Sequence, residues 1–216
     1  NIGRNYIPRP YNYEGYFEHG VTVGEQEPKV KEAIVKIYDA DGYKRTDTEK
    51  TFQAVNYTFS EARRSPGMNA TADDLMFFDD VLTADVVRNT RNVLDSQYVR
   101  DFKLTSKGVF AYEGDSVQIV AYECKRPTLS NSGVADVVKY SGEIYVDMNN
   151  FAVIKNVARL TSKAYNALGR NMLVGGEASR NEVMMTISTN YKKVSSYYFL
   201  SGVSIEYSYL DGGQRV

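Results

Sequence analysis

A period of two residues runs through most of this chain and limits the folds that it can adopt. Apolar and polar side chains alternate in nine segments, near residues 11–23, 29–38, 50–64, 99–112, 115–126, 136–148, 151–163, 182–193 and 196–209. Such alternation is typical of β-strands, because successive side chains of a strand point to opposite faces of the sheet. Tight-turn sequences separate several of these segments, among them "DADG" at 39–42, "EGD" at 113–115 and "MNN" at 148–150. The pattern predicts about nine strands joined mainly as antiparallel hairpins.

The period changes between residues 71 and 92. An apolar stripe with a spacing of three or four residues runs through Leu75, Phe78, Leu82 and Val86, which predicts an amphipathic helix. Thr83 is suited to begin a second short helix in the same stretch.

Strand number and helix placement together predict the architecture. A long meander twists, so it should curl rather than stay flat. We therefore expect a mainly β, α+β fold: a strongly curved antiparallel half-barrel of about nine strands, with two short helices on its concave side. We expect residues 1–216 to form a single domain and to be a fragment of a longer secreted protein.

Composition excludes few classes of protein. The chain of 216 residues has a formal net charge of -1, so nothing in its overall charge favours nucleic acid as a partner. It contains no run of 18 apolar residues, so we expect no membrane span in this chain. Cys124 is the single cysteine; a small core residue is the simpler interpretation, and a reactive thiol is the alternative.

Catalytic residues are hard to find in this sequence. His19 is the single histidine, and Glu18 beside it should point to the opposite face of a strand. One histidine and one cysteine do not supply the usual zinc ligand sets. We therefore expect no enzyme activity, no metal and no cofactor. A carboxylate-pair hydrolase stays open as an alternative, because four acidic residues flank "LMFF". They are Asp73, Asp74, Asp79 and Asp80.

Two binding hypotheses follow from the pattern. Several strands carry apolar residues on both faces, and a sheet covered only in part by short helices leaves an apolar groove. We expect this groove to hold a lipid chain or a hydrophobic peptide segment of a partner. Its lining residues are expected to be Ile34, Phe78, Ile119 and Ile144. Arg63 and Arg64 at a strand end form a candidate anion clamp, with ordinary surface residues as the alternative.

The segment "YSGEIYVDMNNFAVIKNVA" carries a motif at Gly142, Ile144, Tyr145, Val146, Asp147, Ala152, Val153 or Ile154, and Lys155. This motif resembles that of a family of uncharacterised envelope proteins of Gram-negative bacteria. "NIGRNYIPRPYNYEGYF" resembles the entry of the family domain, "TADVVRN" a short helix, and "GDSVQIVAYECKR" one of its strands. One departure is that Glu18 and His19 stand where the family usually has a basic residue.

This resemblance implies a location and a shape. The family often carries a carboxypeptidase-regulatory-like domain upstream, and the present domain should be similar in shape to periplasmic lipoprotein-carrier half-barrels. The periplasm or the outer membrane is the implied location. A scaffold module beside an outer-membrane transport protein is the implied alternative to a lipid carrier. The family has no established catalytic residues to carry over.

Overall fold

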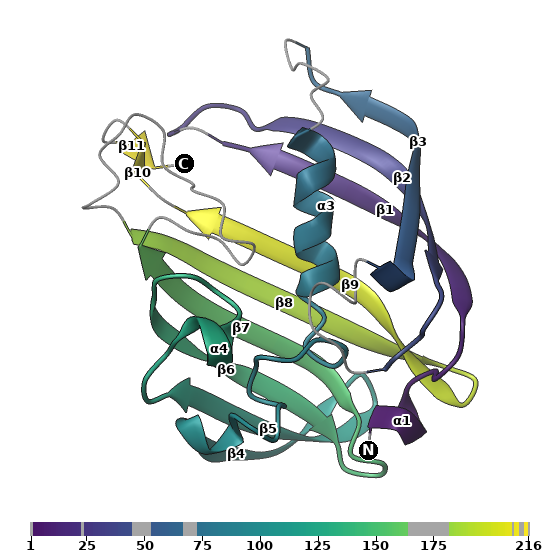
Figure 1. Ribbon diagram of the computed structural model, residues 1–216, viewed down its shortest axis with the longest axis vertical. Coiled ribbons are helices and arrows are strands. Elements are labelled where there is room, and N and C mark those ends of the chain that lie inside the picture. The colour runs from purple at the N-terminus through teal and green to yellow at the C-terminus, as the bar shows by residue number, and fades with distance from the viewer. Residues whose placement is uncertain are drawn as a thin grey trace.

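Nine strands of this protein form two antiparallel sheets (Figure 1). The computed structural model describes residues 2–22, 24–44, 53–66, 73–163, 182–208, 210–211 and 214–215. The three-stranded sheet contains β1 (Tyr11–Val21), β2 (Lys29–Asp39) and β3 (Val55–Arg64). The six-stranded sheet contains β4 (Phe102–Tyr112), β5 (Asp115–Cys124), β6 (Val137–Asp147), β7 (Val153–Lys163), β8 (Glu182–Val194) and β9 (Tyr197–Ser208). The two-residue strands β10 (Leu210–Asp211) and β11 (Gln214–Arg215) pair with each other.

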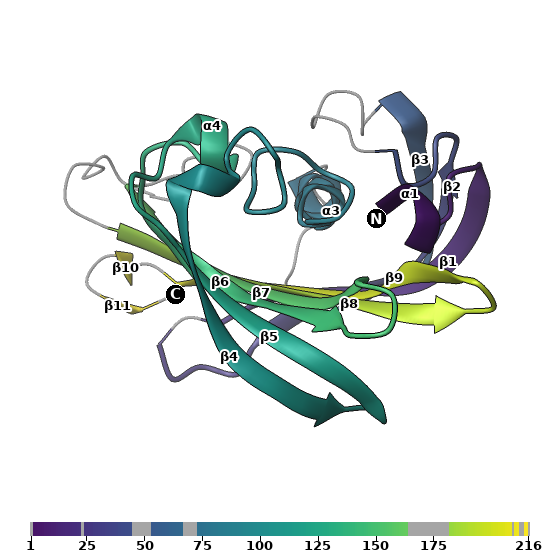
Figure 2. The same cartoon turned by 90° about the horizontal axis from the view of Figure 1, so that it is seen from below.

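Short helices connect and cover the sheets. They are α1 (Ile2–Asn5), α3 (Asp73–Thr83) and α4 (Leu129–Ser132), and a single 3-10 turn, Val99–Asp101, precedes β4. Figure 2 shows α3 and α4 on the same side of the six-stranded sheet. None of the described helices is long and apolar enough to cross a membrane.

The predicted antiparallel meander is confirmed within each sheet, but the prediction that all nine strands form one sheet was wrong. Each strand pairs with its neighbours in sequence order inside its own sheet. The order breaks after β3, and β4 begins a second sheet instead of pairing with β3. The described strands do not close either sheet on itself. The long connection between β3 and β4, which contains α3, carries the chain from the smaller sheet to the larger one.

The prediction of a second helix from Thr83 was also wrong, because side chains form hydrogen bonds with the backbone N–H and C=O groups that a helix would pair with each other. The Asp85 carboxylate accepts bonds from the backbone N–H groups of Val87 and Arg88, at 3.1 and 3.2 Å. The Asn89 side-chain amide donates to the backbone carbonyls of Leu82, Thr83 and Asp85. Such local side-chain bonds compete with helical ones. Residues 84–98 therefore form consecutive turns with no α-helix.

The same turn segment ties the two sheets together through buried polar groups. Arg88 forms an ion pair with Asp39 at the end of β2, with a second contact between Nη2 and Oδ1 of 3.1 Å. The Tyr191 hydroxyl of β8 donates to the Asp85 carboxylate at 2.6 Å. Burial raises the pKa of Asp85, although hydrogen bonds from Tyr191 and Arg88 oppose the shift. One turn therefore contacts the three-stranded sheet through Arg88 and the six-stranded sheet through Asp85.

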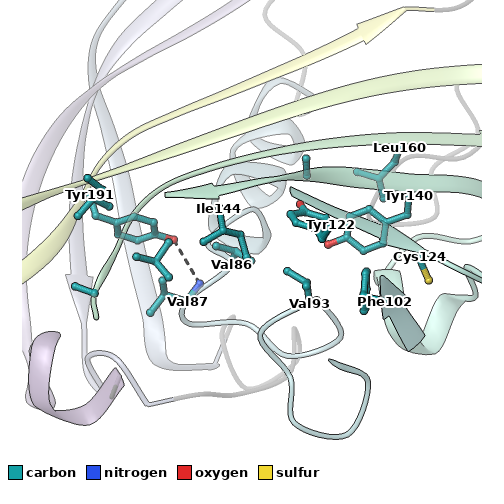
Figure 3. Packing of buried hydrophobic residues seen from close by; sticks show 14 of the residues in the cluster. Val86, Val87, Val93, Phe102, Tyr122, Cys124, Tyr140, Ile144, Leu160 and Tyr191 are labelled. Atoms are coloured by element: carbon teal, nitrogen blue, oxygen red, sulfur yellow. Dashed lines mark hydrogen bonds between the residues drawn. The ribbon is translucent and has the colours of Figure 1, made fainter. Parts of the chain in front are cut away.

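Most of the core lies on the six-stranded sheet. Figure 3 shows Val86, Val87 and Val93 of the turn segment packed toward aromatic and aliphatic side chains from the strands. Three aromatic rings, Phe102, Tyr122 and Tyr140, meet edge to face with centroids 5.4–5.9 Å apart. Gly142 lies opposite Tyr122 in the register of β5 and β6. A smaller cluster joins α3 to the three-stranded sheet and contains Val35, Ile37, Val55, Phe78 and Leu82.

The turn between β6 and β7 is held by the carboxylate of Asp147. This carboxylate accepts hydrogen bonds from the Asn149 backbone N–H, the Asn150 side-chain amide and the Tyr198 hydroxyl, each at 2.7 Å. Burial by itself would raise the pKa of Asp147, but these hydrogen bonds outweigh it and lower the pKa below its ordinary value of 3.8. The aspartate thus fixes the turn and anchors it to β9.

Replacing Asp147 with Asn should destabilise the protein at neutral pH and much less in acid. The folded-state pKa is lowered, so the stabilisation is present above the unfolded pKa and is lost as the pH falls through the folded one. We expect a loss of about 1–3 kcal/mol at pH 7. Urea unfolding at neutral pH and at about pH 3 measures the difference from the unmodified protein. An equal difference at both values would contradict the ionised role of Asp147.

Candidate functional site: a groove between two strand edges

A groove of about 710 Å³ lies between β1 of the smaller sheet and β9 of the larger one. Residues of α3 form part of its wall. The inward apolar lining comes from Tyr13, Phe17, Val35, Ile37, Phe78, Leu82, Val203 and Ile205. The groove is therefore bounded by two sheets and one helix, with side chains from elements far apart in the sequence.

Strand alternation determines which side chains enter the groove. Along β1 from Tyr11 to Gly20 the residues at odd positions are half-buried and those at even positions are exposed, which turns Tyr13, Gly15 and Phe17 inward. In β9 the half-buried Val203 and Ile205 alternate with exposed Ser204 and Glu206. The period of two that predicted these strands thus also gives the groove apolar walls.

Contacts between the two walls close the groove at one end. At the closed end Tyr6 forms a parallel bridge with Tyr198, and the rings of Tyr11 and Phe199 meet edge to face at 5.5 Å. The Leu200 backbone N–H also donates to the Tyr43 hydroxyl at 2.9 Å. Beyond this point β1 and β9 do not pair with each other. Both strands run in the same direction away from the closed end (Figure 1).

Of the two glycines in the groove walls, Gly15 of β1 is at an inward position, whereas Gly202 of β9 lies on the outer face of the larger sheet with Ser204 and Glu206. A Cβ atom on Gly15 would lie 3.7 Å from Cγ1 of Val35, and one on Gly202 would lie 3.8 Å from the side chain of Asn190. Both distances are ordinary contacts, and neither glycine has a left-handed backbone. Glycine inside a strand weakens it relative to alanine by about 0.5–1 kcal/mol. The fold therefore does not require glycine at either position, and a larger side chain at the inward Gly15 would narrow the groove.

Polar contacts hold α3 between the sheets. The Tyr57 hydroxyl of β3 donates to the Asp79 carboxylate at 2.8 Å, and the Tyr207 hydroxyl of β9 donates to the Asp80 carboxylate at 2.9 Å. Burial, and then the bond to Asp79, raises the pKa of Tyr57, so that its hydroxyl keeps its proton and remains a donor. These two carboxylates of the hydrolase alternative therefore position α3. The side chains of Asp73 and Asp74 lie outside the described part of the chain.

The four residues expected to line a groove do not share one surface. Ile34 neighbours Val35 on β2 and points to the opposite face, toward the exposed Tyr16, whereas Phe78 packs on Val35. Ile119 lies opposite Tyr145, and Ile144 lies opposite Val120, so the two isoleucines occupy opposite faces of the six-stranded sheet. Only Phe78 lines the observed groove. Sequence alternation indicated the two faces of each strand but not which face would meet which helix.

The remaining candidates lie apart from one another. Arg63 and Arg64 are exposed at the end of β3, and Arg63 contacts Glu32 of β2 at 4.0 Å. Because the two arginines are adjacent in a strand, their side chains point to opposite faces of the sheet. His19 lines the open part of the groove on β1. Cys124 is buried, and burial raises the pKa of its thiol, which disfavours a reactive thiolate.

Sequence reasoning missed the two walls that form the groove, β1 and β9. The isolated Gly15 inside the alternating pattern of β1 was the available signal, because such glycines mark places where another group approaches closely.

Comparison with known proteins adds no relative of this chain. No family model matches it, and neither the curated proteins nor the solved structures contain a match.

Proposed function

We propose that this domain is a non-enzymatic binding module that holds an extended apolar ligand in the groove between β1 and β9. The observation that carries this proposal is the apolar groove itself, in which Gly15 of β1 and Val203 of β9 are inward positions on opposite walls. Apolar pockets with a few polar groups at the mouth are the usual form of a ligand site. In this proposal the two sheets act as the walls of a curved half-barrel, and α3 covers part of the space between them.

We further propose the periplasm or the outer membrane as the location, on the basis of the order of the envelope-family motifs. Fractionation of cells that produce the full-length protein tests this location. Recovery in the cytosol alone would overturn it.

A second candidate is an interaction module beside an outer-membrane transport protein. Exposed apolar side chains near the strand ends of the larger sheet favour it: Phe110 is 50% exposed and Phe151 is 64% exposed. Phe151 also has a φ of 62°, a conformation that is strained for a bulky residue. Because its ring is exposed, packing inside this domain does not offset the strain. Stable binding of a protein partner that survives loss of the groove would favour this candidate.

Filling the groove should abolish binding of an apolar probe without unfolding the protein. We expect the dye N-phenylnaphthylamine to fluoresce more strongly with the unmodified protein. The double variant Gly15→Val, Val203→Phe, which enlarges one inward side chain on each wall, should bind it at least about tenfold more weakly, which corresponds to about 1.4 kcal/mol. Dye titration measures the affinities, and circular dichroism checks that each variant is folded.

Asn12→Val is the matched control, because Asn12 lies on the outer face of β1 and outside the groove lining. This variant should bind the dye as the unmodified protein does. Equal dye binding by the folded double variant would mean that the groove is not the site.

A further inference from the structure

The groove walls present backbone hydrogen-bonding groups as well as apolar side chains. Among the described residues, β1 has a neighbouring strand only at its β2 edge, and β9 only at its β8 edge. From Tyr13 to Glu18 and from Ser201 to Glu206, no described group outside those neighbours pairs with the backbone. Unpaired N–H and C=O groups along a strand edge are a template for pairing with another chain.

Strand directions specify what fits between these edges. Every pair of adjacent strands in the two sheets is antiparallel. Direct pairing of β1 with β9 would be parallel, because the two strands run the same way and their entry residues Tyr6 and Tyr198 form a parallel bridge. A single added strand that runs the opposite way would be antiparallel to both. It would unite β3, β2 and β1 with β9 and the rest of the larger sheet.

We propose that the ligand of the groove is an extended peptide segment of a partner protein, which adds as a strand between β1 and β9. This inference rests on the proposed function, because it assigns the chemical class of the groove ligand. An acyl chain would cover the apolar walls but would leave the backbone groups of both edges without partners, and burying such groups is unfavourable. A peptide strand pairs with both edges and places alternate side chains inward.

The groove also sets the length and pattern of the peptide. Eight consecutive residues of β9, Leu200 to Tyr207, line the groove, so a segment of about eight residues spans it. Its inward side chains meet Phe17, Phe78 and Val203 and should therefore be apolar and of moderate size. The outward side chains lie near exposed Glu14, Tyr16 and Ser204 and should be polar.

Three probes separate strand addition from simple apolar binding. The first is a fluorescein-labelled peptide of alternating threonine and valine, long enough to span the groove. The second is the same peptide N-methylated at alternate residues, which removes the donors along one edge but keeps the side chains. The third is decanoate, an apolar chain without backbone groups. Fluorescence anisotropy measures the affinity of the unmodified protein and of Gly15→Val, Val203→Phe for each peptide, and displacement of the dye measures decanoate.

Strand addition predicts that the unmethylated peptide binds, that N-methylation weakens its binding at least about tenfold, and that the double variant Gly15→Val, Val203→Phe no longer binds it. Equal binding of the two peptides, or binding of decanoate and the dye but of neither peptide, would overturn strand addition and leave the apolar groove in place. Failure of the dye, decanoate and both peptides to bind would overturn the proposed function itself.

Discussion

Gly142→Ala should destabilise the protein strongly, because the added methyl group has no space. A Cβ atom at this position would overlap the carbonyl oxygen of Val157 and the hydroxyl and ring of Tyr122. The carbonyl belongs to the backbone of β7, and the ring is packed against Phe102 and Tyr140, so neither can move freely. We expect a loss of about 3 kcal/mol in the free energy of unfolding, which is the upper end of the range typical for inserting an extra methyl group into a packed core. Urea unfolding followed by circular dichroism measures it.

Gly15→Ala is the matched control for this prediction. It is also a strand glycine, but its Cβ atom would make only an ordinary contact with Val35. We expect it to leave the stability unchanged or to raise it by about 0.5–1 kcal/mol, because alanine restricts the unfolded chain more than glycine does. Similar stabilities for Gly142→Ala and Gly15→Ala would show that the space around Gly142 is larger than the structure indicates.

Arg88→Leu should be the second severe change, because it leaves a buried carboxylate without its cation. Asp39 is 1% exposed and keeps the backbone N–H groups of Asp41 and Gly42 as partners, which carry no full charge. Breaking a buried ion pair from one side typically costs about 3–5 kcal/mol. The contact also joins the turn after α3 to the smaller sheet, so its loss should loosen that sheet first. Denaturant unfolding gives the energy, and hydrogen exchange of β1–β3 gives the location.

The double variant Asp39→Asn, Arg88→Leu tests whether the buried charge is the cause. Removing the carboxylate charge as well should recover at least about 1 kcal/mol relative to Arg88→Leu. Arg63→Leu provides the surface control: Arg63 is 80% exposed and its contact with Glu32 is long, so its loss should change stability little. A double variant as unstable as Arg88→Leu would assign the loss to packing of the arginine side chain instead.

Local pattern was enough to predict the strands and most of their turns. The predicted boundaries of 136–148 and 151–163 agree closely with β6 and β7, because alternation and turn chemistry act over neighbouring residues. The turn predicted from "MNN" at 148–150 follows β6, although the bond between Asp147 and Tyr198 that anchors it joins residues 51 positions apart and could not be read from the pattern. The helix predicted after Thr83 failed for a local reason, since Asp85, Asn89 and Asn92 offer competing hydrogen bonds.

The sequence by itself determined the strand order, the two faces of each strand and the position of α3, because these depend on residues close together along the chain. Only the tertiary structure decided that β3 and β4 part into two sheets, that Arg88 reaches Asp39, and that the edges of β1 and β9 face each other across a groove. Each of these pairs elements remote in sequence, and alternation assigns a side chain to a face without specifying what that face will meet. Gly15 and Val203 can be recognised as opposite sides of one groove only after the structure places β1 and β9 as its walls.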